Sequence, residues 1–140
     1  MRSTITLIVL IFAFLGLLLG FAASYDSETP PPSDENRSFI VDVAGEKFVV
    51  RATDNQTIQQ LIDNYNGNNN MHITGKLIRG DGGFNQPWSW HLDPPSVNMA
   101  EISIEVCDGT PSYVEEHLDE WLATVGDTYC PWGSKVVALN

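Results

Sequence analysis

One short stretch of the chain, residues 85–95, limits the fold more than any other feature because it is rich in both proline and tryptophan. Two of the four tryptophans, Trp88 and Trp90, lie here, with prolines on both sides of them. Proline is excluded from helix interiors, whereas large aromatic rings usually bury much of their surface. We therefore interpret the stretch as a long, ordered connection that lies against the core and stiffens one end of the domain.

The first 24 residues have the pattern of a segment that directs export. Arg2 is the only charged side chain before an uncharged, proline-free run over residues 5–23, and small residues stand at the end of that run. This order is typical of a secretory signal peptide, with cleavage after Ala22 or Ser24. The alternative is a membrane anchor formed by residues 5–23, because the run is nearly long enough to span a bilayer. In both cases the rest of the chain is predicted to be secreted or extracytoplasmic.

A linker is predicted between this segment and the folded part. Residues 25–38 combine three consecutive prolines with Asp, Glu, Ser and Asn, a composition that favours a solvated, extended chain. Residues 39–140 remain for a single α+β domain with a modest core. No internal repeat is visible in them.

The charge balance limits the kinds of partner. The chain has 18 acidic and 7 basic side chains, which gives a formal net charge of −11 at pH 7. So acidic a chain repels phosphate backbones, which argues against nucleic-acid binding. The charge favours an extracellular protein with a basic surface as the partner, although an acidic surface that is merely solvated would give the same composition. A membrane becomes a partner only if the N-terminal segment is retained as an anchor.

The chain has two cysteines, Cys107 and Cys130. Two thiols in an exported chain usually pair, and this pair would enclose the second predicted helix. The alternative is a nucleophilic Cys107 served by His117, but no third group that would orient the histidine is evident. We therefore expect a disulfide.

A hairpin is predicted at the start of the domain. Residues 39–43 and 47–51 are rich in β-branched and aromatic residues, and residues 44–46 between them suit a turn. One long strand with a bulge at Gly45 is the alternative.

Two helices are predicted from apolar residues that recur at intervals of three and four. The first is capped by Asp54 or Asn55 and ends at Gly67. The second begins at Thr110, before a proline, and ends at Gly126. The buried stripes are predicted to be Ile58, Leu61, Ile62 and Tyr65 in the first helix, and Val114, Leu118, Trp121, Leu122 and Val125 in the second.

Three further strands are predicted, at residues 72–78, 97–106 and 135–139. Apolar and polar residues alternate in the second of them, which is typical of a strand with one buried face. That buried face is predicted to be Ile102, Ile104 and Val106. The order of the elements, with an extra N-terminal strand, predicts a ferredoxin-like (split βαβ) plait, in which two helices pack on one face of an antiparallel sheet.

Acidic residues gather on the second predicted helix. They are Glu115, Glu116, Asp119 and Glu120. They form two like-charged pairs four residues apart, and such pairs weaken a helix slightly. Glu116 and Glu120 are therefore candidate residues for docking a basic partner or weakly binding a cation. A solvated helix face is the alternative.

The three histidines, His72, His91 and His117, have no metal-binding spacing, so neither a metal site nor a cofactor is predicted. His91 lies close to Asp93 and to two tryptophans, which makes His91 and Asp93 candidate binding residues. The alternative is a structural histidine that donates a hydrogen bond to Asp93 or to a backbone carbonyl. No catalytic residue is predicted.

Four motifs in a fixed order resemble a known family. They are Pro-Trp-Ser-Trp-His-Leu-Asp-Pro at residues 87–94, Ile-Glu-Val-Cys-Asp at 104–108, Tyr-Val-Glu-Glu-His-Leu-Asp-Glu at 113–120 and Cys-Pro-Trp at 130–132. The chain resembles, over roughly residues 48–137, the family of small exported domains named after the N-terminal domain of a protein called BP seventy-four. Trp90 stands where we expect phenylalanine in this family, which keeps an aromatic anchor. The resemblance implies a domain identity but no activity or catalytic residue.

Three functions fit these observations. The leading hypothesis is an exported, non-enzymatic binding module with an aromatic surface, whose acidic helix selects the partner. The aromatic surface would consist of Trp88, Trp90 and Trp132. The second is an inhibitor or propeptide-like partner of an exported protease, by analogy with plaits that cap proteases. The third is a small hydrolase that uses His91 with Asp93 or Glu105.

Overall fold

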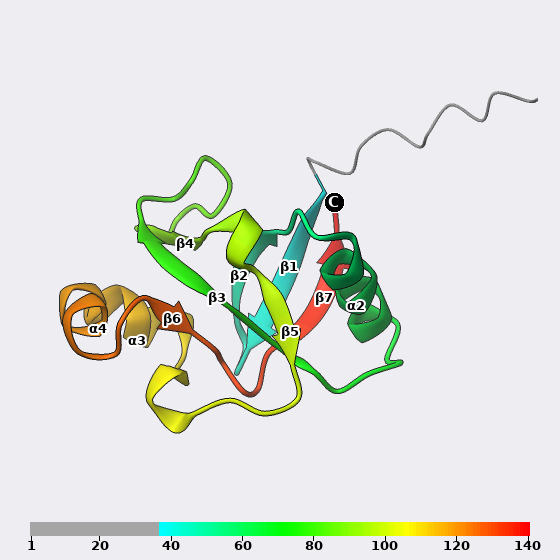
Figure 1. Cartoon of the computed structure of the whole chain (residues 1–140). Coiled ribbons are helices and arrows are strands. Elements are labelled where there is room, and N and C mark those ends of the chain that lie inside the picture. Colours follow the sequence, from blue (N-terminus) through cyan, green and yellow to red (C-terminus); the bar gives the residue numbers. More distant parts are fainter. Residues whose placement is uncertain (1–36) are drawn as a thin grey trace, which may run out of the picture. The chain divides into compact units, whose positions relative to one another are not determined.

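The structure is a computed structural model, and it describes residues 37–140. The predicted signal peptide or anchor and nearly all of the predicted linker lie outside these residues. The described part is an α+β domain whose strands pair antiparallel, as predicted (Figure 1). None of its helices is long and apolar enough to cross a membrane.

The first sheet contains three strands in the order β2–β1–β7. β1 (Ser38–Val43) and β2 (Glu46–Arg51) form the predicted hairpin, and β7 (Lys135–Leu139) pairs with β1. The two residues of the turn, Ala44 and Gly45, have positive φ angles of 52° and 87°. Two positive φ angles are characteristic of the type I′ turn, whose twist matches that of the strands it joins. The prediction of a hairpin is therefore confirmed over the alternative of one bulged strand.

The second sheet is built around β3 (His72–Arg79). Three short strands pair with successive parts of it: β4 (Trp90–Leu92) with residues 77–79, β5 (Asn98–Ala100) with residues 72–74 and β6 (Thr128–Tyr129) with residues 75–76. The short helix η1 (Pro94–Ser96) stands between β4 and β5. Because the strands divide between two sheets, the finer prediction of a ferredoxin-like plait is not confirmed.

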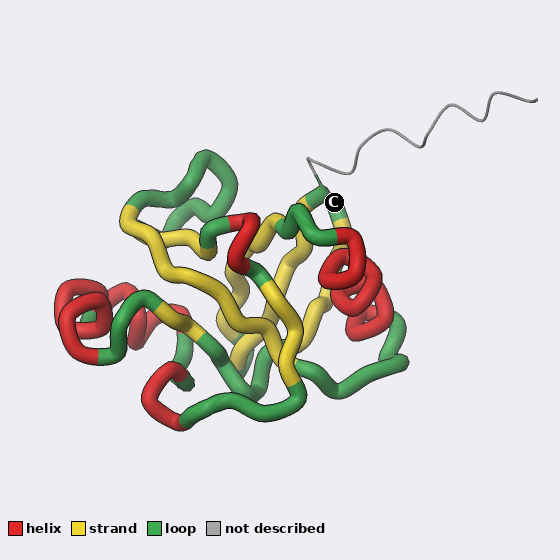
Figure 2. The backbone as a smooth tube through the Cα atoms, viewed as in Figure 1, coloured by secondary structure: helices red, strands yellow, loops and turns green. Residues whose placement is uncertain are grey.

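The helices lie on two sides of the domain (Figures 1 and 2). α2 (Asn55–Tyr65) lies beside β7, whereas α3 (Pro111–Glu116) and α4 (Leu118–Thr124) lie on the other side, near β6. Asp54 caps α2 as predicted, since its carboxylate accepts a hydrogen bond of 2.8 Å from the amide of Thr57. Tyr65 belongs to the last turn of α2 and is exposed, so its place in the predicted buried stripe is wrong.

The predicted single second helix is instead two short helices. They meet at His117, whose backbone leaves the helical range with φ −119° and ψ 24°. The break falls between the members of both like-charged pairs, Glu115–Asp119 and Glu116–Glu120, which a continuous helix would hold close together. The predicted buried stripe is confirmed in part, since Val114 and Trp121 are buried and the other three predicted members are half-buried.

One buried apolar cluster joins both sheets and the three α-helices, and Trp90 lies within it. The ring centroid of Trp90 is 5.4 Å from that of Phe48 in β2 and 5.5 Å from that of Tyr129 in β6. The Trp-rich stretch therefore lies against the core, as predicted. Trp90, His91 and Leu92 were expected in a connection without strand structure, and that expectation is wrong, because the end of β3 offers them backbone groups to pair with.

Asn85 ties the Trp-rich stretch to the first sheet. Its side chain is completely buried. The side-chain oxygen accepts a hydrogen bond of 2.7 Å from the amide of Val49 in β2, and the side-chain nitrogen donates one of 2.7 Å to the carbonyl oxygen of Trp90 in β4. One amide group thus satisfies a backbone group in each sheet, which buried polar groups require.

The predicted strand over residues 97–106 is wrong beyond Ala100, where β5 ends. The residues predicted to form its buried face are instead exposed: Ile102 by 88%, Ile104 by 68% and Val106 by 60%. The reason is that β3, the strand with which β5 pairs, does not extend this far. β3 begins at His72, which pairs with Ala100, so β3 offers residues 101–106 no strand to continue on.

Candidate functional site

Residues 101–106 form an exposed stretch that we call the apolar segment; its last two residues, Glu105 and Val106, belong to the short helix η2 (Glu105–Cys107). Its side chains alternate between apolar and polar, and the three apolar ones are the most exposed large apolar side chains of the described residues. Within the part of the chain that the structure describes, no backbone group of residues 101–104 pairs with another backbone group. Three large apolar side chains so exposed within five residues are the feature of this stretch that needs an explanation.

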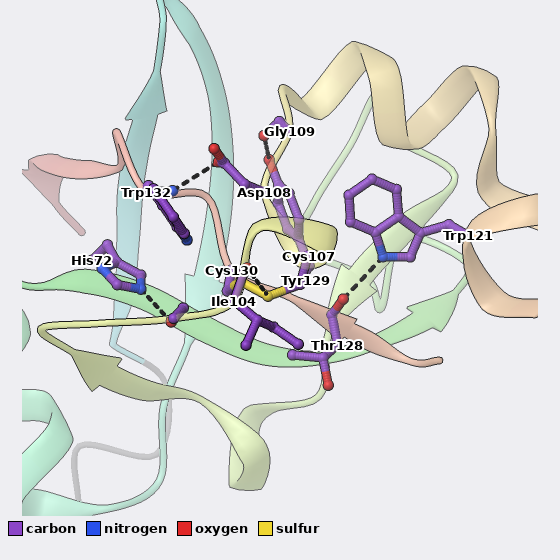
Figure 3. The surroundings of a disulfide bond; sticks show 11 residues. His72, Ile104, Cys107, Asp108, Gly109, Trp121, Thr128, Tyr129, Cys130 and Trp132 are labelled. Carbon is purple, nitrogen blue, oxygen red and sulfur yellow. Dashed lines mark hydrogen bonds between the residues drawn. A yellow bond between two sulfur atoms is a disulfide. The ribbon is translucent and has the colours of Figure 1, made fainter. Parts of the chain in front are cut away.

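Two anchors hold the apolar segment in place. β5 holds its start, and the disulfide between Cys107 and Cys130 holds its end (Figure 3). Both cysteines are buried, and the amide of Cys130 donates a hydrogen bond of 2.8 Å to the carbonyl oxygen of Cys107. The predicted pairing is confirmed, and the alternative of a nucleophilic Cys107 is excluded because its sulfur is bonded.

Aromatic residues support the disulfide from within the core. The hydroxyl of Tyr129 donates a hydrogen bond of 2.8 Å to the carbonyl oxygen of Gly109, and the indole nitrogen of Trp121 donates one of 2.9 Å to the carbonyl oxygen of Thr128 (Figure 3). Burial raises the pKa of Tyr129 far above its usual value, and the nearby carboxylates of Asp108 and Glu46 add to the rise. Tyr129 therefore stays a neutral hydrogen-bond donor.

The first of two hollows beside the apolar segment has a volume of about 340 Å³, and we call it the His72 hollow. Its lining residues are Asn70, His72, Glu101, Ile102, Ser103 and Trp132. In Figure 3, His72 and Trp132 lie on one side of the disulfide and Trp121 on the other. Nε2 of the buried His72 lies 2.5 Å from the hydroxyl oxygen of Ser103, so this histidine fixes one residue of the apolar segment.

The burial of His72 is expected to make the stability of the domain depend on pH. Desolvation lowers the pKa of His72 below its ordinary value of 6.5, and the charge of Asp108 offsets only part of that shift. The folded chain then takes up the proton less readily than the unfolded chain, so the contribution to stability is complete above about pH 6.5 and decreases as the pH falls below it.

The pH effect is measured by urea unfolding at about pH 7.5 and about pH 5. His72→Gln keeps a group that can hydrogen-bond Ser103 but cannot be protonated, so its unfolding free energy should fall less between the two pH values than that of the wild type. An equal fall in both proteins would show that His72 does not cause it.

The second hollow lies against α3 and α4 and has a volume of about 240 Å³; we call it the Tyr113 hollow. Its lining includes Val106, Asp108, Tyr113, His117, Glu120 and Trp121. The rings of Tyr113 and His117 are stacked, with centroids 4.2 Å apart. Nδ1 of His117 lies 2.9 Å from the carbonyl oxygen of Tyr113, which fixes the histidine ring against the tyrosine. The apolar segment thus has a hollow near each of its ends.

The three tryptophans predicted to form one aromatic surface do not form one. Trp90 is completely buried, so its predicted role in an exposed binding surface is wrong. Trp88 is half-buried, stacks on Trp90 with centroids 6.0 Å apart, and donates a hydrogen bond of 2.9 Å to the carbonyl oxygen of Lys47. Trp132 is 44% exposed and lines the His72 hollow. Of the three, Trp132 is the one that lies beside the apolar segment.

His91 makes the contacts of a structural residue. Its Nδ1 lies 2.7 Å from the carbonyl oxygen of Gly80, and the ring of Phe84 packs edge-on against it with centroids 5.5 Å apart. The predicted hydrogen bond to a backbone carbonyl is therefore present. Among the described residues, His91 has no hydrogen bond or ion pair with Asp93 or Glu105.

The four acidic residues of α3 and α4 divide into two kinds. Glu115 accepts hydrogen bonds from the amide and the hydroxyl of Ser89, at 2.9 and 2.6 Å, and Asp119 pairs with Arg79 at 2.6 Å. The side chains of Glu116 and Glu120 are exposed and have no ion pair within the described part. These two are the ones that the sequence named as candidate binding residues, and they are the two available to a ligand.

The sequence interpretation did not identify several residues that surround the apolar segment. They are Asn70, His72, Ser103, Asp108 and Tyr113. The available signal was the combination of an alternating apolar stretch with a cysteine directly after it, because a disulfide can hold in place a stretch that pairs with no strand.

Comparison with known proteins gives one match. The family model described as the BP seventy-four N-terminal domain matches residues 35–140, which includes every residue of both hollows and of the apolar segment. No curated protein and no solved structure matches the chain.

Proposed function

Since this chain belongs to the BP seventy-four N-terminal domain family, we propose that it is an exported, non-enzymatic module that binds another protein through the apolar segment. The observation that supports this most is the exposure of Ile102, Ile104 and Val106 on a stretch whose backbone is unpaired over residues 101–104. A buried disulfide at the end of that stretch agrees with an oxidising compartment outside the cytosol.

The chemistry of the segment favours an extended partner. An extended peptide can add to unpaired backbone groups as a further strand, and alternate side chains then meet alternate side chains. Glu101 and Glu105 are exposed within the segment, and the whole chain has a net charge of −11. The partner should therefore present a stretch in which apolar residues alternate with Lys or Arg, which agrees with the predicted extracellular protein with a basic surface.

A second copy of this chain fits the segment less well. Antiparallel pairing over residues 101–104 that brings Ile102 and Ile104 of two copies onto one face also brings Glu101 of both copies onto the other face. Like charges opposed across two strands are destabilising. Neither a protease inhibitor nor a hydrolase that uses His91 is favoured by a specific contact of the described residues, so both stay predictions from the sequence.

The proposal is tested with a library of extended peptides in which apolar residues alternate with basic or with neutral ones. The wild-type chain should select the basic peptides. Ile102→Ser combined with Ile104→Ser should weaken binding at least tenfold, since burial of each apolar side chain contributes on the order of 1.5–3 kcal/mol. Val137→Ser is the matched control, because Val137 is also an exposed apolar side chain but belongs to β7.

Charge variants show which acidic group the partner contacts. Glu101→Gln with Glu105→Gln should weaken the binding and its salt dependence, whereas Glu116→Gln with Glu120→Gln should change both less. The reverse result would indicate that the partner binds the acidic face of α3 and α4, as the sequence predicted. Peptide selection that is unaffected by the double serine variant would refute binding through the apolar segment.

A further inference from the structure

The Tyr113 hollow has a size that suits a small group. Its volume of about 240 Å³ lies below the roughly 300–1,000 Å³ of pockets that hold a drug-sized ligand. It is an open depression between the end of the apolar segment and the helices α3 and α4. A small head group at the end of a longer molecule would fit into it, while the rest of that molecule remained outside.

The charge of the hollow favours a cation. Asp108 lines it from the chain directly after Cys107, and Glu120 lines it from α4. Neither carboxylate has an ion pair among the described residues, and Asp108 accepts one hydrogen bond, of 2.9 Å, from the amide of Trp132. Two carboxylates without a counter-charge repel an anion and attract a cation. A neutral ligand gains no such attraction.

The aromatic lining favours an alkylated cation over a metal ion. Tyr113 is 50% exposed and forms a wall with His117, and Val106 and Trp121 add apolar surface. Aromatic rings attract ammonium groups, and methylated ammonium groups are the ones that aromatic sites recognise best. Metal ions instead require several oxygen, nitrogen or sulfur ligands at once. The described residues contain no group of three or more His, Cys, Asp and Glu side chains that could supply them.

From this size, charge and lining we infer that the Tyr113 hollow is a binding site for a trimethylammonium group. Tyr113 contacts the methyl groups, and Asp108 and Glu120 balance the positive charge. The same chemistry has two sources: a free choline-like molecule, or a trimethylated lysine side chain of a protein. This site adjoins the apolar segment at Val106, but Ile102 and Ile104, the two residues changed in the double serine variant, do not line it.

The test is a titration of the chain, with its disulfide intact, by choline chloride, followed through the NMR shifts of its backbone amides. Saturable shifts are expected around the hollow, at residues 106–109 and 113–125. The neutral isostere of choline, in which carbon replaces the ammonium nitrogen, should bind much more weakly. Sodium chloride at the same ionic strength controls for salt. A peptide with trimethyllysine, titrated beside its unmodified form, distinguishes the protein source from the free molecule.

Variants at two exposed positions of the hollow test which side chains bind choline. Tyr113→Ala should weaken choline binding about three- to tenfold, and Glu120→Gln should weaken it by a smaller factor. Glu116→Gln is the matched control, since Glu116 is a neighbouring exposed acid that does not line this hollow. The double serine variant at residues 102 and 104 should bind choline like the wild type. The experiment therefore distinguishes failure of the choline site from failure of the proposed peptide binding. Absence of saturable shifts, or equal binding of the neutral isostere, would overturn the inference.

Discussion

Replacing Trp90 by alanine is expected to lower the unfolding free energy of the domain by about 3–5 kcal/mol, the usual cost of truncating a buried aromatic residue. Its ring is completely buried and lies within 6.0 Å, centroid to centroid, of the rings of Phe48, Trp88 and Tyr129. A small domain has about 5–15 kcal/mol of stability in total. The variant is therefore expected to unfold at a much lower urea concentration than the wild type.

Trp90→Phe is expected to cost far less, within about 1.5 kcal/mol. The indole nitrogen of Trp90 is the one buried side-chain nitrogen or oxygen of the described residues without a hydrogen-bond partner. Leaving such a donor unpaired costs about 1–3 kcal/mol, and phenylalanine removes the donor while keeping a ring in the cluster. The gain offsets much of the volume lost.

Urea unfolding of the wild type, both Trp90 variants and Trp132→Ala compares these costs. Trp132→Ala is the matched control because Trp132 is 44% exposed, and its loss should lower the unfolding free energy much less than the loss of Trp90. Similar destabilisation by Trp90→Ala and Trp90→Phe would show that the identity of the ring, and not merely its presence, stabilises this core.

Reduction of the disulfide between Cys107 and Cys130 is expected to cost about 3.5 kcal/mol, from the chain entropy that a loop of this length regains on opening. The two cysteines are 23 residues apart in the sequence. The reduced chain also loses the second anchor of the apolar segment. Binding of the basic peptides should therefore weaken under conditions in which most of the chain is still folded.

The unfolding free energy of the oxidised and the reduced chain is measured by urea unfolding with and without reductant. Cys107→Ala combined with Cys130→Ala gives the same loss without a reductant and serves as the control for its side effects. Unchanged stability together with unchanged peptide binding would mean that β5 alone holds the apolar segment.

The parts of the fold that were predicted correctly depend on local chemistry. The turn at Ala44 and Gly45 and the cap at Asp54 are each encoded within a few neighbouring residues. The division of the strands into two sheets depends instead on which strands meet, and the short pairings of β3 are made with residues far along the chain. Sequence periodicity contains no information on where a partner strand ends, so Ile102 was predicted to be buried.

The candidate site shows the same division. Counting cysteines was enough to predict the disulfide, and the exposure of Glu116 and Glu120 followed from their place among charged neighbours. The alternating pattern of residues 101–106 is identical for a buried strand and for an exposed stretch that lacks a partner. The hollows could not be predicted because their walls come from distant segments, such as His72 and Trp132.

The two hydrogen bonds of Asn85 affect how the domain opens in solution. Because one buried side chain holds the amide of Val49 and the carbonyl oxygen of Trp90 together, the sheets cannot separate without exposing both groups at once. Local openings that expose only the hairpin should therefore be rare, and amide protons of β2 and β3 should exchange with solvent through one shared global event. The apolar segment lies outside this unit, so its amides should exchange quickly even while the core stays closed.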